Sequence, residues 1–156
     1  MTTVSSKKFK RRDRIVDFVG EWHNQHGSVI HVEEADGDLI KGTFKSGVGS
    51  VDPEKDYPLI GFISDDLICF TVKFGPHQCV TPWTGQHTVV DDAEKIETMW
   101  HLARPIPDRA EEKSLWAGIW TGADTYIRST GKKERKLDRI DRPPFHPSYP
   151  FRISLK

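Results

Sequence analysis

The titratable residues of this 156-residue chain are poorly spaced for catalysis or metal binding. The acidic pairs at 65–66 and 91–92 fall in expected turns, which makes them poor candidates for a general acid and base. His77 and Cys79 stand two apart, but two ligands do not make a metal site. No nucleophile–base pair can be assembled from the positions expected to face inward. These residues argue against an enzyme and predict no metal site.

Other polar and aromatic residues are spaced as a binding site would need. Asn24 and Ser28 lie four apart, which places both on one face of a strand unless the intervening Gly27 changes the count. Taken alone, the pair more often closes a turn between two strands. Trp100 and Leu102 lie two apart, so one face of their segment is apolar. Such a face forms either a ligand-binding wall or an ordinary core.

The elements that must position these residues are short and rich in β-branched and aromatic residues, which predicts strands. We expect strands at 20–24, 28–34, 39–45, 57–64, 67–74, 79–90, 96–103 and 115–127. Residues typical of hairpin turns separate them at 35–38, 64–66, 75–76 and 91–92. No segment keeps a helical spacing of apolar residues over three turns.

Eight short strands joined mainly by tight turns predict an all-β fold, an eight-stranded antiparallel up-and-down β-barrel. Closure removes the exposed edges of the sheet and leaves room inside for one small ligand. Lysine and arginine together number 23, as do aspartate and glutamate, so no net charge favours nucleic acid or a membrane surface. We therefore expect neither as a partner.

We expect three regions along the chain. Residues 1–18 form a basic N-terminal arm, with six Lys or Arg between Lys7 and Arg14. Residues 19–127 form the barrel, and 128–156 form a charged, proline-rich tail in which prolines prevent regular pairing. The basic start is not followed by the apolar segment of a secretory signal. A cytoplasmic location is therefore the default expectation, and a secreted one if a signal has been removed.

Six short motifs follow one another through the predicted barrel. They are GEWHNQHGS at 20–28, LIKGTF at 39–44, YPLIG at 57–61, WTGQ at 83–86, TMWHL at 98–102, and LW followed by GADTY within 115–126. In this order and spacing they resemble the avidin and streptavidin family of biotin-binding proteins, over about residues 19–127. The resemblance implies the same eight-stranded barrel, non-covalent binding of biotin, no cofactor and no catalysed reaction.

The resemblance also implies which residues contact biotin. Asn24 and Ser28 would donate to the ureido oxygen, while Ser46 and Asp124 would accept from the two ureido N–H groups. An acid at Asp124 would polarise the ureido group toward an oxyanion. Thr81 would face the ring sulfur. The full implied set is Asn24, Ser28, Phe44, Ser46, Val48, Phe74, His77, Cys79, Thr81, Trp83, Trp100, Leu102, Trp116 and Asp124.

Aromatic residues would enclose the apolar part of biotin. Phe74, Trp83 and Trp100 would form a box around its rings, with Leu102 nearby. Trp116 would leave its own barrel and cap the pocket of a neighbouring subunit, which requires a homotetramer. The alternative for Trp116 is an ordinary buried core position.

The sequence departs from the family pattern at several of these positions. Phe44 stands where the family usually has a tyrosine that donates a third hydrogen bond to the ureido oxygen, and a phenyl ring cannot donate. Phe74 replaces a usual tryptophan, and His26 replaces an apolar residue. His77 and Cys79 stand where small hydroxyl residues often hold the ligand carboxylate; His77 could pair with it or be a solvated loop residue. These departures predict an affinity below the family's extreme.

Two other functions remain open from the sequence. One is an avidin-like barrel with weakened biotin affinity, which binds another small ligand or its own C-terminal tail. The missing hydroxyl at Phe44 and the apolar end at 149–156 motivate that alternative. The other is an enzyme in a lipocalin-like barrel, which the lack of a nucleophile–base pair disfavours.

Overall fold

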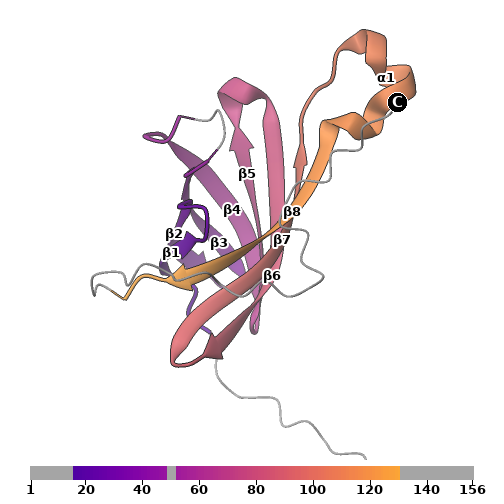
Figure 1. The fold of residues 1–156 in the computed structure, drawn as a ribbon. Helices are drawn as coiled ribbons and strands as arrows, with labels where there is room; N and C mark the ends of the chain where they lie inside the picture. Colours follow the sequence, from indigo (N-terminus) through magenta and orange to yellow (C-terminus); the bar gives the residue numbers. More distant parts are fainter. Residues whose placement is uncertain (1–15, 49–51, 131–156) are drawn as a thin grey trace, which may run out of the picture.

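The computed structural model describes residues 16–48 and 52–130, and these form a closed antiparallel barrel in which each strand pairs with the next and β8 pairs with β1 (Figure 1). The strands are β1 (Gly20–Asn24), β2 (Val29–Asp36), β3 (Leu39–Lys45), β4 (Asp56–Ser64), β5 (Leu67–Phe74), β6 (Cys79–Val90), β7 (Ala93–Ala103) and β8 (Ile119–Arg128). The predicted eight-stranded up-and-down barrel is confirmed.

The strands form because apolar and polar residues alternate with the period of a pleated strand. In β5 the inward residues Ile68, Phe70, Val72 and Phe74 are all buried in the core. Each such side chain stabilises the fold by about 1.5–3 kcal/mol when it is removed from water. Tight turns set the register between strands: Asp91 and Asp92 both have positive φ, the conformation that a two-residue hairpin turn needs.

Packed rings close one end of the barrel. Phe18 precedes β1, is buried, and lies with its ring 6.4 Å from that of Trp22 and 6.0 Å from that of His87. The Trp22 Nε1–H donates to the Phe18 carbonyl at 3.0 Å, and the Arg128 guanidinium lies 4.1 Å from the Trp22 ring centre. Among the described residues, these rings fill this end of the barrel, and the cavity described below lies at the opposite end.

Most of the two predicted arms lies outside the described residues. Of the N-terminal segment 1–18, the structure describes residues 16–18, and Phe18 packs into the barrel core. Residues 131–156 are not among the described residues, so the tail and its suggested place in the cavity stay predictions. No helix in the described part of the chain is long and apolar enough to cross a membrane.

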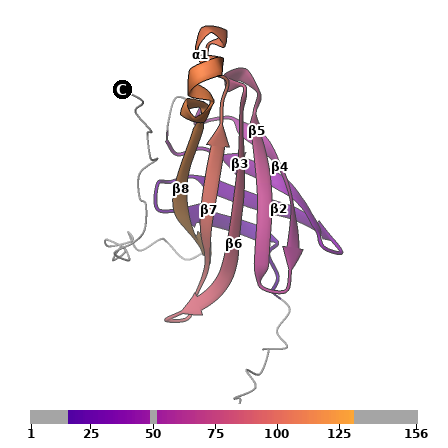
Figure 2. The same ribbon diagram turned by 90° about the vertical axis from the view of Figure 1, so that its right-hand side faces the viewer.

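The connection between β7 and β8 corrects the sequence prediction. The expected strand at 115–127 begins only at Ile119, because Leu115–Gly118 forms a 3-10 helix, η2, after the helix α1 (Asp108–Ser114). The residues of α1, DRAEEKS, are nearly all polar, so no apolar periodicity reveals the helix. Asp108 and Glu111 favour its first turn, where the helix dipole is positive. Figures 1 and 2 show α1 projecting beyond the end of the barrel.

Candidate functional site

The barrel holds a cavity of about 330 Å³ at the end where β3, β5 and β7 finish. This volume lies within the range of roughly 300–1,000 Å³ that is typical of small-molecule sites. Its lining residues come from β1, β3, β5, β6, β7, β8 and their connections. They are Asn24, His26, Ser28, Phe44, Ser46, Val48, Phe74, His77, Cys79, Thr81, Trp83, Trp100, Leu102, Arg104, Trp120 and Asp124.

All the predicted ligand-binding residues except Trp116 line this cavity. The structure therefore brings them together, while their contact with a ligand stays a prediction. Sequence reasoning missed Arg104 and Trp120, and it noted His26 only as a departure from the family pattern. Trp120 lies four residues before Asp124 on the same strand, an even spacing that could have placed both on the inner face. Arg104 follows β7 outside any strand pattern, and its guanidinium stacks on Trp120 at 4.4 Å.

One side of the cavity offers hydrogen-bond donors. The Asn24 Oδ1 accepts the backbone N–H groups of Ser28 at 2.8 Å and His26 at 3.0 Å, which leaves the Nδ2 hydrogens for another partner. The Ser28 Oγ accepts the Gly47 N–H at 3.0 Å, so its own proton is available to donate. Asn24 thus closes the turn with its oxygen, which is one of the two roles that the sequence left open, and its donation to a ligand stays a prediction.

The close approach of Gly47 to the turn after β1 makes the Ser28 contact possible. A Cβ on Gly47 would lie 2.3 Å from the carbonyl carbon of Gly27, nearer than any real Cβ contact. Glycine at this position therefore lets the end of β3 rest directly on the turn. The result is a Ser28 hydroxyl whose lone pair is occupied and whose proton is free.

Ser46 and Asp124 offer acceptors to the cavity. The Ser46 hydroxyl donates its proton to the Val48 carbonyl at 2.7 Å, so its oxygen can only accept from a ligand. Asp124 is 5% exposed, and its Oδ2 accepts the Trp83 Nε1–H at 2.9 Å. Its Oδ1 lies 3.4 Å from the donating Nε2 of Gln25. Each carboxylate oxygen keeps lone-pair capacity for a further N–H donor.

Burial raises the pKa of Asp124, and the hydrogen bond from Trp83 opposes this shift. The cause is that a carboxylate loses favourable hydration when it is enclosed by protein. Additional N–H donors from a ligand would offset that loss. Asp124 is therefore a strong potential partner for a molecule that presents N–H groups to the cavity.

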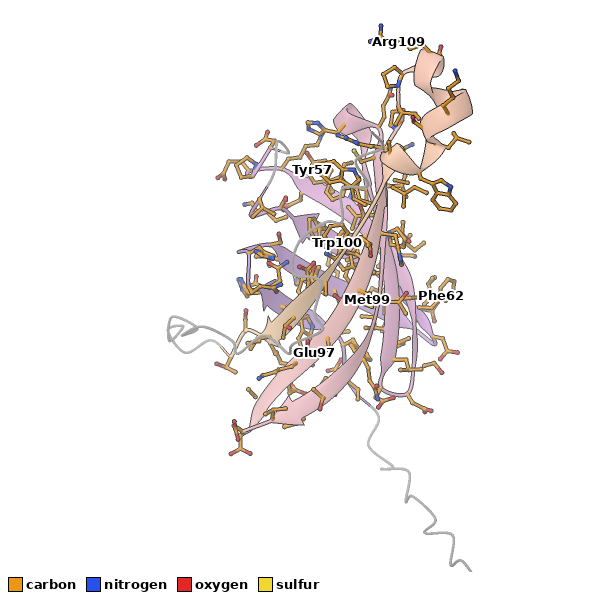
Figure 3. The ribbon with its side chains drawn as sticks, turned by 45° about the vertical axis from the view of Figure 1, so that its right-hand side comes forward. Tyr57, Phe62, Glu97, Met99, Trp100 and Arg109 are labelled. Atoms are coloured by element: carbon orange, nitrogen blue, oxygen red, sulfur yellow. The ribbon has the colours of Figure 1, made fainter. Side chains whose placement is uncertain are left out.

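Aromatic rings form most of the apolar wall. The Phe44 ring lies 5.1 Å from that of Trp83 and 5.6 Å from that of Phe74. Trp83 in turn stacks on Phe70 at 5.1 Å, nearly parallel. Figure 3 shows Trp100 at mid-height of the barrel, far from Arg109 on α1. This wall suits an apolar ring system.

Trp116 does not contribute to the cavity of its own barrel. It belongs to η2 and is 69% exposed, so the alternative of an ordinary buried tryptophan is wrong. The Arg104 N–H donates to the Gly118 carbonyl at 2.9 Å and ties η2 to the end of β7. An exposed tryptophan beside the open end of the barrel is available to a second molecule.

Comparisons with known proteins agree with this architecture. Residues 12–129 match the model of the Avidin family. Xenavidin is 26% identical, and the alignment covers 74% of this chain and all of that chain with a TM-score of 0.63. The biotin complex of short afifavidin is also 26% identical over 70% of this chain and 87% of that chain, with a TM-score of 0.60. No curated protein matches the chain.

A further solved structure shows the same fold at lower identity. The biotin binding protein from chicken is 23% identical, and the alignment covers 74% of this chain and 98% of that chain with a TM-score of 0.65. At this identity the likeness establishes the fold, and the arrangement of the cavity must be argued from its own residues.

Proposed function

The chain belongs to the avidin family, and we propose that its barrel cavity binds biotin non-covalently through hydrogen bonds to the ureido group and an apolar, largely aromatic box. Proteins of this family are binding proteins rather than enzymes. The short afifavidin structure is a complex with biotin at 26% identity to this chain, which supports the same ligand here.

The observation that carries the proposal is the division of the cavity into donors and acceptors. A ureido group presents one acceptor oxygen and two N–H donors. The Asn24 amide hydrogens are not needed by its own turn, and the Ser28 oxygen accepts from Gly47 and keeps its proton to donate, while Ser46 and Asp124 have acceptor capacity left. These four side chains therefore complement a ureido group, and they line one cavity.

The remaining wall matches the rest of the ligand. Phe74, Trp83, Trp100 and Leu102 would enclose the thioether ring and the start of the valeryl chain. The Thr81 hydroxyl is buried and lacks a hydrogen-bond partner among the described residues, so it can donate to the ring sulfur. Phe44 would lie beside the ureido group, and at the open end the carboxylate would lie near His77, Cys79 and Arg104, beside Val48.

Isothermal titration should give a dissociation constant of micromolar or tighter for biotin, with one ligand per chain. Lipoic acid is the matched control ligand because it has a sulfur ring and a valeric acid chain but no ureido group. We expect no measurable binding of lipoic acid. Equal binding of both ligands would show that the cavity recognises only apolar surface, and no binding of biotin would contradict the proposed function.

We also propose a homotetramer in which Trp116 of one subunit covers the cavity of another. Trp116 is exposed, and the outer barrel surface carries the exposed apolar residues Ile60, Phe62, Leu67 and Met99. Figure 3 shows Phe62 and Met99 on the outside of the strands. Such exposed apolar side chains are typical of surfaces that bind another protein.

Light scattering at micromolar concentration should give a mass about four times the 17.9 kDa of one chain. Trp116→Lys should lower both the assembled fraction and the affinity for biotin, because it removes the shared wall. Val90→Lys, an exposed position at the closed end, is the control and should change neither. A monomeric wild type, or a Trp116→Lys protein with unchanged biotin affinity, would contradict the shared cavity.

A further inference from the structure

A buried hydroxyl lies behind the donor side of the cavity without a partner. Tyr126 is 0% exposed, and its hydroxyl has no hydrogen-bond partner among the described residues. It follows Asp124 by two positions on β8, so both side chains point inward. Its ring meets that of Phe70 edge to face at 6.2 Å, which fixes the direction of the ring.

The residue opposite Tyr126 carries an amide with two donor hydrogens, and this amide lowers the pKa of both Asp124 and Tyr126. In the antiparallel pair of β1 and β8, Asn24 and Tyr126 are direct partners, and such partners have neighbouring side chains. The Asn24 Oδ1 is already occupied by two backbone N–H groups of the turn. Its Nδ2 has two hydrogens, and the oxygen of one ligand needs only one of them.

Tyr126 stays protonated because burial, aided by the negative charge of Asp124, raises the pKa of its hydroxyl well above the ordinary value. The amide of Asn24 acts in the opposite direction on the same pKa, as a donor close to the phenolic oxygen does. The neutral hydroxyl keeps acceptor lone pairs for an N–H group.

The wall on the other side of the ureido site lacks a hydroxyl, because Phe44 packs there against Trp83 and Phe74. We propose that Tyr126 is a positioning residue for ligand binding: its hydroxyl accepts one Nδ2 hydrogen of Asn24 and so directs the other hydrogen at the ureido oxygen. This inference rests on the proposed function. The Tyr126 hydroxyl on β8 would thus support ureido binding, which Phe44 on β3 cannot do because its ring has no hydrogen-bond donor.

Tyr126→Phe tests the inference because it removes only the hydroxyl. We expect biotin to bind three- to tenfold more weakly, mainly through a faster off-rate, since Asn24 loses its second contact. The thermal midpoint of the empty protein should stay the same or rise, because an unpaired buried hydroxyl has been removed. A lower midpoint together with the weaker binding would indicate a purely structural role and would overturn the inference.

A double-mutant cycle with Asn24→Ser gives the decisive comparison. Serine keeps a side-chain oxygen for the turn but has no amide hydrogens to position. In the Asn24→Ser background, Tyr126→Phe should change biotin affinity by less than twofold. An equal loss in both backgrounds would overturn the role through Asn24. Failure of the wild type to bind biotin would instead contradict the proposed function, so the two failures are distinguishable.

Discussion

Replacing Asp124 with alanine should weaken biotin binding by roughly 10²–10⁴-fold, more than any single change in the apolar wall. A hydrogen bond to a charged group contributes about 1.5–3 kcal/mol, and a buried N–H left without an acceptor costs about 1–3 kcal/mol. The ureido N–H facing Asp124 would suffer both effects. Isothermal titration of the two proteins measures the difference.

Asp124→Asn is the matched control because it keeps the shape of the side chain and one acceptor oxygen. We expect an affinity between those of the wild type and Asp124→Ala, since the asparagine oxygen can still accept but carries no charge. Both variants must retain the far-ultraviolet circular dichroism of the barrel. Equal affinity of wild type and Asp124→Ala would remove Asp124 from the binding site.

The stability of the empty protein should respond to Asp124→Asn in the opposite direction. Burial raises the pKa of Asp124 above its ordinary value of 3.8, so between the two pKa values the folded state binds more protons than the unfolded state. The carboxylate therefore lowers stability at neutral pH, and this loss disappears as the pH falls below 3.8. Asp124→Asn should raise the thermal midpoint at pH 7 but leave it nearly unchanged at pH 3.

A residue that lowers the stability of the empty protein but strengthens ligand binding is typical of a binding site. Asp124 is held in a position where its charge is poorly solvated, and Trp83 supplies only one strong hydrogen bond. N–H donors from a ligand favour the ionised carboxylate, so biotin should bind more weakly as the pH falls through the pKa of Asp124. The same residue would thus destabilise the empty barrel and stabilise the complex.

The sequence predicts the barrel well because its strands obey local rules. Segments such as Leu39–Lys45 and Leu67–Phe74 alternate apolar and other residues, and short turns separate them, so the observed strand limits equal the predicted ones. The helix α1 could not be predicted in the same way. It is short and polar, and it projects beyond the barrel, so it leaves no apolar face in the sequence.

The candidate site could be predicted only through the spacing of family motifs. Nothing local to Ser46 or Thr81 distinguishes a cavity position from an ordinary strand position. The sequence could not show which hydrogen-bonding atoms are already paired within the protein. The Asn24 oxygen accepts from the backbone of its own turn, and the Ser46 hydroxyl donates to the Val48 carbonyl. These contacts depend on the backbone path of two loops. Arg104 was missed for the same reason, since it follows β7 in a connection without periodicity.

Gly122→Ala should weaken biotin binding by roughly five- to 150-fold through the position of Trp100. Gly122 lies opposite Trp100 in the pair of β7 and β8, and the indole covers it. A Cβ at Gly122 would be 2.3 Å from the Trp100 Cζ2 and 2.6 Å from its Cε2, so the ring must move. Overpacking of this kind costs about 1–3 kcal/mol. Titration with biotin reports the affinity, and a change in tryptophan fluorescence that is absent when Trp100 is replaced by phenylalanine reports the displacement.

The direction in which the Trp100 indole moves shows whether this ring forms part of the apolar wall of the cavity. Because the backbone of Gly122 lies on one side of the indole, the ring can relieve the contact only by moving toward the cavity that it lines. Gly75→Ala is the control, since a Cβ there would meet no atom within 4 Å, and its affinity should stay within about twofold of wild type.

Adding Trp100→Phe to Gly122→Ala should recover thermal stability but not affinity, because the smaller ring fits yet leaves the wall incomplete. Wild-type affinity in Gly122→Ala would show that Trp100 does not form the ligand-binding wall.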